Sequence, residues 1–375
     1  MSVSISLPGL LLAILVSLHM VTVAIAALSC RTAARRRVTS VTRLPPVTIV
    51  RPVSGADFML AETLASGFAL DHPNYETIFC AASETDAAVP TVRALLDRHA
   101  GANARLLIGN EAISENPKLN NIAKGWRAAA HDWIVMTDSN VLMPPDYLQR
   151  CFAAWDKSAG LVAAPPAGTH TLNFGADVEA AFLNTHQARW QYAANAIGFG
   201  FAQGKNLMFR RDILRAAGGV RSLASDLAED AAATKVVRAQ GYDVRLASGP
   251  FAQPLGERDW GSVWSRQARW ARLRRLSFPF WYALEIFSGA LPPTLIALWW
   301  ALATGRGVAG VLAGLWVVWF GLEWALARIA GWPDSPRALG AMMLRDLLLP
   351  LLWIQGWRNR GFSWQGHAMA QSQRS

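Results

Sequence analysis

Residues 133–140 read WIVMTDSN, an apolar run that ends in a carboxylate and an amide. A short apolar run of this kind, bounded by turn-forming residues, is typical of a buried strand. Asp138 then follows the strand directly, and Asn140 comes two residues later. The stretch therefore predicts a buried strand with polar side chains at its carboxyl end.

Three similar runs precede this stretch, with helical patterns between them. Strands are expected at residues 47–53 (VTIVRPV), 75–81 (YETIFCA) and 104–109 (ARLLIG), and helices at 56–70, 89–99 and 116–130. This alternation predicts an α/β fold with a Rossmann-like, mostly parallel sheet covered by helices on both faces. Ligands of such sheets bind beyond the carboxyl ends of the strands, where Asp86 and Asp138 both lie.

A membrane anchor is expected before the sheet. Residues 7–28 contain no charged side chain and are long enough to cross a hydrocarbon core. The basic residues follow this run rather than precede it, which argues against a cleaved signal peptide. They are Arg31, Arg35, Arg36, Arg37 and Arg43. The positive-inside rule then predicts that the amino terminus is outside and that the following domain is cytoplasmic.

Three apolar stretches follow the sheet region. Residues 280–304 contain Pro292-Pro293 and are expected to kink, and residues 307–330 carry one acid, Glu323. Residues 339–357 carry Arg345 and Asp346, which are expected to pair because a lone charge in lipid is costly. This last stretch either spans or is re-entrant. A re-entrant segment would leave the tail, with Arg358 and Arg360, in the cytoplasm, as the charge rule favours.

These patterns predict four regions and an integral membrane protein, placed in the inner (cytoplasmic) membrane. The expected boundaries are an anchor at residues 1–30, a cytoplasmic catalytic domain at 45–275, membrane helices at 276–358 and a tail at 359–375.

Composition agrees with a membrane protein and not with a nucleic-acid binder. The 375 residues are 52% hydrophobic, and the formal charge of +10 is clustered beside the apolar segments. Such clusters suit an anionic membrane surface and a polyanionic small substrate, and no nucleic-acid-binding signature is present. Three scattered cysteines without metal spacing suit a reducing compartment.

The polar residues suit transfer from a diphosphate-activated donor. Asp138 could bind a hard divalent ion, and Asn140 could add an amide oxygen or contact the donor. Asp230 could act as the base that deprotonates an attacking hydroxyl. Arg266 and Arg269 offer forked donors to phosphate oxygens, and Trp270 could wall the acceptor site.

Each residue also has a structural interpretation. An aspartate at a strand end often caps a turn or helix, and arginines and tryptophans before an apolar helix often anchor it at a membrane interface. Glu229 could be a solvated helix residue. The ordered set favours the chemical interpretation.

The order and spacing of these residues resemble those of the ceramide glucosyltransferases, a branch of the inverting glycosyltransferase families 2 and 21. The matching positions are Asp86, Asp138, Asp230, and Arg266, Arg269 and Trp270 of the (Q/R)-x-x-R-W motif. Further matches are residues 116–121 (NPKLNN), 160–162 (GLV) and 210–219, and His186 in NTHQARW. The resemblance covers nearly the whole chain.

The resemblance implies a GT-A fold and the transfer of glucose from a UDP-sugar to a ceramide hydroxyl with inversion. It makes Asp86 a uridine contact and places Lys118 near the donor phosphates. It makes Asp138 a metal or diphosphate contact, with Mg²⁺ or Mn²⁺, and Asp230 the base. His186 would lie near the acceptor or nucleotide, with Glu229 on the acceptor side.

One departure narrows the family and leaves other functions open. The usual D-x-D turn is Asp138-Ser139-Asn140 here, without the second acid. This favours the ceramide branch over hopanoid-associated relatives. The alternatives are another UDP-sugar (galactose, N-acetylglucosamine or a uronic acid) or a glycerolipid acceptor. A processive polysaccharide synthase would need more spanning helices, and a non-enzymatic membrane scaffold would not need the ordered carboxylates.

Overall fold

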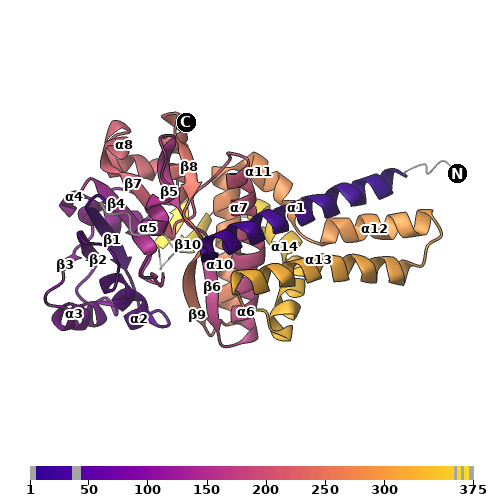
Figure 1. Ribbon diagram of the computed structural model, residues 1–375, viewed down its shortest axis with the longest axis horizontal. Helices are drawn as coiled ribbons and strands as arrows, with labels where there is room; N and C mark the ends of the chain where they lie inside the picture. Colours follow the sequence, from indigo (N-terminus) through magenta and orange to yellow (C-terminus); the bar gives the residue numbers. More distant parts are fainter. Residues whose placement is uncertain (1–5, 36–43, 359–360, 365–366, 371–375) are drawn as a thin grey trace. The chain divides into compact units, whose positions relative to one another are not determined.

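The computed structural model describes residues 6–35, 44–358, 361–364 and 367–370 (Figure 1). Arg36, Arg37, Arg43 and Arg360, which entered the prediction of membrane orientation, lie outside these residues. The chain divides into two compact units. We call Ser29–His170 with Gln191–Gly256 the sheet unit, and Met1–Leu28, Thr171–Trp190 and Glu257–Ser375 the membrane-helix unit.

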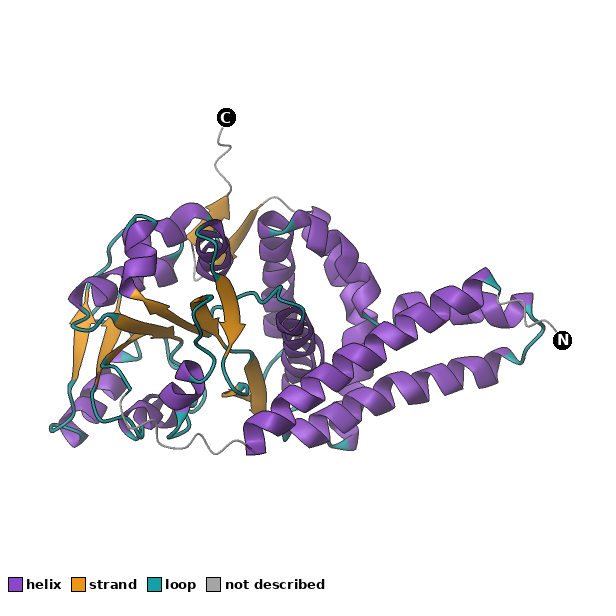
Figure 2. Ribbon diagram, turned by 45° about the horizontal axis from the view of Figure 1, so that its top comes forward, coloured by secondary structure: helices purple, strands orange, loops and turns teal. Residues whose placement is uncertain are grey.

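The sheet unit contains a seven-stranded sheet within the described residues (Figure 2). Its strands, in spatial order, are β3 (Ala104–Ile108), β2 (Tyr75–Ala81), β1 (Val47–Val53), β4 (Trp133–Thr137), β7 (Asn206–Arg210), β5 (Ala159–Ala163) and β8 (Asp243–Leu246). The first four strands are parallel, as predicted, and β5 and β8 are parallel to each other. β7 runs antiparallel to β4 and β5. A separate ribbon pairs β6 (Pro166–Thr171) with β9 (Phe251–Gly256).

Helices cover both faces of this sheet, which explains why β1 is buried along its whole length. The helices are α2 (Leu60–Ala65), α3 (Val89–Arg98), α4 (Pro117–Ala128), α5 (Tyr147–Phe152), α8 (Arg211–Ala216) and α9 (Glu229–Ala239), with 3₁₀ turns η1 (Ser66–Phe68) and η3 (Gly219–Ser225). α4 approaches one face so closely that a Cβ on Gly125 would meet Val50 and Cys80. On the opposite face, α2 and α3 pack against Phe79.

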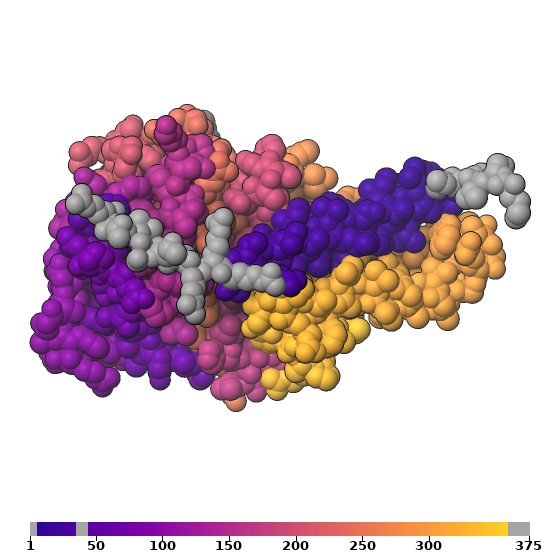
Figure 3. Space-filling model, viewed as in Figure 1, coloured from indigo at the N-terminus to yellow at the C-terminus, as the bar shows by residue number. Residues whose placement is uncertain are grey.

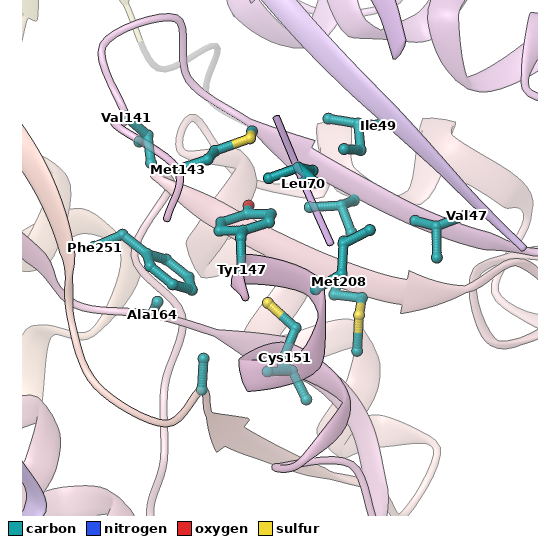
Figure 4. Packing of buried hydrophobic residues seen from close by; sticks show 14 residues of the cluster. Val47, Ile49, Leu70, Val141, Met143, Tyr147, Cys151, Ala164, Met208 and Phe251 are labelled. Atoms are coloured by element: carbon teal, nitrogen blue, oxygen red, sulfur yellow. The ribbon is translucent and has the colours of Figure 1, made fainter. Parts of the chain in front are cut away.

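The core beside β4 fixes the centre of the sheet (Figure 4). On the face of the sheet that α2 and α3 cover, α5 contributes Tyr147 and Cys151 to this core. These two side chains pack against Val47, Ile49 and Met208 of the strands. Fully buried aliphatic and aromatic side chains each stabilise a fold by about 1.5–3 kcal/mol. This packing therefore holds the carboxyl end of β4 in place.

The helix predicted at residues 56–70 is shorter than expected. α2 begins only at Leu60, because Gly55 and Met59 both adopt positive φ, at 70° and 54°. Asp57 stays in the loop and accepts a hydrogen bond from Asn140 Nδ2 at 3.3 Å. Residues 56–59, which were predicted to begin the helix, therefore belong to the loop that follows β1.

The membrane-helix unit contains the apolar segments at both ends of the sequence. Its helices are α1 (Leu7–Arg35, which continues into the sheet unit), α6 (Phe174–Ala181), the π-helical η2 (Phe182–Ala188), α10 (Trp260–Ser277), α11 (Pro279–Leu284), η4 (Glu285–Ser288), α12 (Leu291–Ala303), α13 (Val308–Ala330) and α14 (Pro336–Arg358). α7 (Arg189–Ala196) leads into the sheet unit, and a hairpin pairs β10 (Gly361–Trp364) with β11 (His367–Ala370).

Three of the described helices are long and apolar enough to span a membrane: α1, α13 and α14. The residues from α11 to α12 could form a fourth, broken span with a bend of 51°. This break comes just before the expected kink at Pro292-Pro293, because those prolines occupy the first turn of α12. In Figure 3 the surface of α1 lies against that of α12 and α13, where Gly9 approaches Trp300 and His19 stacks on Trp319 at 3.7 Å.

A buried charge network joins these apolar helices. Arg345 Nε lies 2.6 Å from Asp346 Oδ1, so the predicted pairing is confirmed, and the Arg345 guanidinium also donates to Glu323 of α13. His19 of α1 belongs to the same network, because its Nδ1 accepts a hydrogen bond from Arg189 Nη1 at 2.6 Å. All five side chains are buried. Mutual pairing explains how they can lie inside apolar helices.

Removing one partner of this network should be severe. We expect Arg345→Leu to destabilise the protein by about 3–5 kcal/mol, because Glu323 and Asp346 would be left buried without their cation. Thermal unfolding of the purified chain in detergent measures the loss. The matched control is Arg328→Leu on α13, an exposed arginine 3.5 Å from Asp334, which should change stability by less than about 0.5 kcal/mol. Equal effects of both substitutions would contradict this account.

Candidate active site

The pairing of β4 with β7 assembles the centre of the site. The antiparallel register sets Thr137 opposite Asn206, so Lys205 stands opposite Asp138. The backbone N–H of Asp138 donates to Lys205 O at 3.2 Å, and Lys205 Nζ lies 2.8 Å from Asp138 Oδ2. Lys205 Nζ also donates to Asn140 Oδ1 at 3.3 Å. One ammonium group thus sits between the two polar side chains of the Asp138-Ser139-Asn140 turn.

A second lysine reaches the same carboxylate from α4. Asn116 caps this helix by accepting from the backbone N–H groups of Lys118 and Leu119, and Pro117 takes the first helical position. The cap directs Lys118 towards the sheet, where its Nζ lies 2.6 Å from both Asp138 Oδ1 and Glu229 Oε1. It also donates to the carbonyl oxygen of Gly204. All three N–H groups of the ammonium are therefore used.

These contacts keep Lys118 and Asp138 charged. Burial opposes ionisation of Asp138, but the ammonium groups of Lys118 and Lys205 outweigh it and hold the pKa of Asp138 well below its ordinary value. Burial likewise opposes the charge on Lys118, and Asp138 and Glu229 outweigh it and raise the pKa of Lys118. The centre of the site is a carboxylate held between two cations.

Glu229 and Asp230 open α9, where acidic residues suit the positive end of the helix dipole. Burial, and then repulsion from Glu229, raise the pKa of Asp230 to about 7. The two carboxyl groups lie around Gly204: a Cβ there would be 2.9 Å from Glu229 Oε1, 3.2 Å from Lys118 Nζ and 3.4 Å from Asp230 Oδ2. Asp230 is therefore a half-buried carboxyl group, with a pKa near neutral pH, beside the lysine-bridged cluster.

Asp86 lies in the loop after β2 and has a clear structural role. Its Oδ1 accepts from the backbone N–H groups of Gly55 and Ala88, each at 2.9 Å. It thereby ties the loop that follows β1 to the start of α3. These two bonds are compatible with Asp86 as a loop anchor and also as a ligand contact, because neither bond uses its second carboxylate oxygen.

The remaining predicted residues belong to the membrane-helix unit. Arg266 on α10 pairs with Glu179 at 2.7 Å, and burial lowers the pKa of Arg269 to about 10, which leaves it charged at neutral pH. Trp270 is half-buried on the same helix. His186 is buried, its Nε2 lies 2.9 Å from Ser288 Oγ, and burial lowers its pKa well below the ordinary value. This histidine is neutral.

The structure thus brings together Lys118, Asp138, Asn140, Glu229 and Asp230 within the sheet unit. It assigns Arg266, Arg269, Trp270 and His186 to the other unit. Lys205 and Gly204 join the cluster although the sequence did not single them out. Only their position directly before a strand could have drawn attention to them, because their place opposite Asp138 depends on the β4–β7 register.

The cluster offers little to a divalent ion by itself. Among the described residues no three His, Cys, Asp or Glu side chains are grouped as metal ligands. Asp138 and Asn140 supply one carboxylate and one amide oxygen, which are the oxygen ligands that Mg²⁺ and Mn²⁺ prefer. Both already accept from lysine. These two residues fit such an ion only together with further oxygens, such as those of a diphosphate.

Comparison with known proteins identifies the fold and the family. A mannosyltransferase from Pyrobaculum calidifontis, solved with GDP-Man and Mn²⁺, matches with a TM-score of 0.51 over 94% of this chain and 98% of its own, at 18% identity. This likeness confirms the predicted GT-A fold.

Curated relatives are named ceramide glucosyltransferases. Ceramide glucosyltransferase 3 of Caenorhabditis elegans is 28% identical over 343 residues, which are 87% of this chain and 74% of the relative. The enzyme of Komagataella phaffii is 36% identical over 116 residues, or 30% of this chain and 23% of the relative. The family model for glycosyl transferase family 21 matches residues 13–374. The chain is therefore a glycosyltransferase enzyme and belongs to glycosyl transferase family 21.

Proposed function

We propose that this enzyme transfers glucose from UDP-glucose to a hydroxyl group of ceramide, with inversion at the anomeric carbon. The observation that carries the proposal is the half-buried Asp230 carboxyl group, with a raised pKa, beside the pair of lysines on Asp138. This arrangement would supply a base and a cluster of cations at one end of a GT-A sheet. The names of the relatives support the choice of glucose and ceramide.

The two lysines are suited to the leaving group. As the bond between the anomeric carbon and the diphosphate breaks, negative charge develops on the phosphate oxygens. The ammonium groups of Lys118 and Lys205 lie on either side of Asp138 and are held there before the donor arrives. Fixed charges of this kind stabilise a transition state without reorganising during the reaction.

The base is Asp230. The acceptor oxygen attacks the anomeric carbon and forms the new glycosidic bond, and its proton passes to the Asp230 carboxylate. The bond to UDP breaks, and the electron pair leaves with the diphosphate. A carboxyl group with a pKa near the working pH is effective in this role. Glu229 raises that pKa and, in the sequence-based assignment, lies on the acceptor side.

A divalent ion fits this scheme as an addition to the lysines. Asp138 and Asn140 would hold Mg²⁺ or Mn²⁺ against the diphosphate, and the ion would supply further positive charge. Asp86 remains the predicted contact for uridine. Arg266 and Arg269 remain predicted phosphate donors, and His186 and Trp270 remain predicted acceptor contacts.

The proposal includes association with the inner membrane and a cytoplasmic active site. Three candidate spans and the lipid named in the relatives support association with a membrane. Arg31 and Arg35 at the end of α1 support a cytoplasmic location for the residues that follow. The domain boundaries at residues 30, 45, 275 and 358 are part of the same proposal.

The direct test is an assay of the purified full chain. It would be offered UDP-glucose, UDP-galactose, UDP-N-acetylglucosamine and a UDP-uronic acid, each with ceramide, diacylglycerol or phosphatidylethanolamine, and the lipids would be analysed by mass spectrometry. We expect hexosylceramide from UDP-glucose as the main product. A main product with another sugar or a glycerolipid would overturn the proposed specificity.

Asp230→Asn should abolish most turnover and leave donor binding intact. We expect kcat to fall by about 10²–10⁴-fold, because the amide cannot accept the proton, while the Kd for UDP measured by calorimetry changes little. Asp212→Asn, an exposed carboxylate paired with Arg210, is the control and should retain activity. Loss of UDP binding in Asp230→Asn would contradict the assignment.

The pH profile provides a second measurement of Asp230. Its pKa of about 7 means that it is protonated, and unable to accept a proton, at lower pH. The plot of kcat/KM against pH should therefore decline below about pH 7, by about tenfold per pH unit. A profile that is flat from pH 5 to pH 8 would exclude Asp230 as the base.

Lys205→Met should make nucleotide binding depend on a metal ion. The substitution removes the ammonium group between Asp138 and Asn140, so a divalent ion must then supply that charge. We expect EDTA to weaken UDP binding more in Lys205→Met than in the parent, as measured by calorimetry. Lys157→Met, outside the cluster, is the control. An identical EDTA effect in all three proteins would contradict the role of Lys205.

A further inference from the structure

The membrane-helix unit contains an apolar cavity that the proposed chemistry does not use. Its volume is about 350 Å³, within the range of about 300–1,000 Å³ found for small-molecule sites. It lies between α10 and α14, and its lining includes Val263, Trp264 and Gln267 from α10 and Leu344, Leu348 and Leu352 from α14. The lining is almost entirely apolar.

One polar group breaks this apolar lining. Gln267 is only 2% exposed, and its Nε2 has no hydrogen-bond partner among the described residues. Its Oε1 accepts from Gln187 at 3.4 Å, so the amide is oriented with a free donor. A buried amide N–H without an acceptor costs about 1–3 kcal/mol. The cavity therefore suits a ligand that is apolar along its length and carries one acceptor oxygen.

Two of the residues that line the cavity are exposed tryptophans. Trp260 and Trp264 are 51% and 37% exposed, whereas Val263 and Leu352 are buried. Tryptophan is enriched at membrane interfaces, because one edge of the ring is apolar and the other is polar. α14 is also a candidate membrane span. Exposed tryptophans beside a candidate span suit the entry of an apolar chain from a lipid layer.

We propose that the cavity binds an aliphatic chain of the lipid acceptor, with the amide carbonyl oxygen of that lipid accepting from Gln267 Nε2. This inference rests on the proposed function for the identity of the lipid. Ceramide meets both requirements, because its amide joins an acyl chain to the headgroup end. Gln267 also stands inside the sequence RQARW, so the helix that carries the predicted phosphate and acceptor residues contacts the lipid as well.

The test uses the full chain in lipid nanodiscs with a ceramide that carries a diazirine in its acyl chain, and no sugar donor. After irradiation, peptide mass spectrometry locates the labelled residues. We expect labels within residues 260–267 and 344–352. Leu348→Trp fills the cavity and should remove these labels. Leu347→Trp, a neighbour that is 57% exposed and does not line the cavity, should keep them.

Gln267→Leu tests the contribution of the amide donor without filling the cavity. It keeps a side chain of similar size and removes the donor, so the KM for ceramide should rise by about threefold to tenfold. The Kd for UDP should not change. This variant also decides the matter if Leu348→Trp proves unstable on heating.

Labels that persist in Leu348→Trp, or that fall mainly on α1 and α12, would overturn the inference. An unchanged KM for ceramide in Gln267→Leu would exclude the proposed hydrogen bond. The cross-link needs no transfer reaction, so the two proposals can fail separately. Cavity labelling without any glycosylation of ceramide would reject the proposed function and keep the aliphatic site. Glycosylation with labels elsewhere would reject the site alone.

Discussion

The ammonium group of Lys118 is the constraint on which the candidate active site at the end of the sheet depends. It is shared by Asp138, which directly follows β4, and Glu229, which begins α9, although these residues are 91 positions apart in the chain. Without a cation between them, the buried carboxylate of Glu229 and the half-buried carboxylate of Asp138 would repel each other, which would favour protonation of one of them. The position of α9, and with it that of Asp230, is therefore coupled to the start of α4, through Lys118 and through the cap residue Asn116, whose Nδ2 donates to Glu229 Oε2 at 2.7 Å.

Glycine leaves room where this cluster meets the segment before β7. A Cβ at residue 204 would lie 2.9 Å from Glu229 Oε1 and 3.2 Å from Lys118 Nζ, so these charged groups would have to shift away from the backbone carbonyl of Gly204, which accepts from Lys118. The same close approach sets Lys205 against Asp138. The turn lacks the second acid of a D-x-D sequence, and Lys205, directly before β7, places positive charge there instead.

Local sequence was sufficient for the features that depend on local pattern. The runs around Val47, Tyr75 and Trp133 are apolar because both faces of those strands are covered, and this made the parallel half of the sheet predictable. The order of acids and the RQARW sequence indicated the family. Lys205 was not predictable, because its role arises from an antiparallel pairing between strands 69 residues apart.

Other differences have equally specific causes. The helix expected from residue 56 starts later because Met59 turns into the left-handed region. The break before α12 falls at Gly289 and Ala290, because prolines favour the first turn of a helix over its interior. The free amide of Gln267 could not be read from RQARW, since burial and a missing partner are properties of the packed helices alone.

The bond between Arg345 and Glu323 also has a consequence for biosynthesis. The two residues lie on successive apolar helices. α14 carries Asp346 beside its own Arg345, whereas α13 alone would present the uncompensated carboxylate of Glu323 to lipid. α13 is therefore not well suited to partition into the bilayer by itself as it leaves the ribosome. α13 and α14 are therefore expected to insert into the bilayer together, as a hairpin. α13 would stay at the insertion site until α14 has emerged and Arg345 can pair with Glu323.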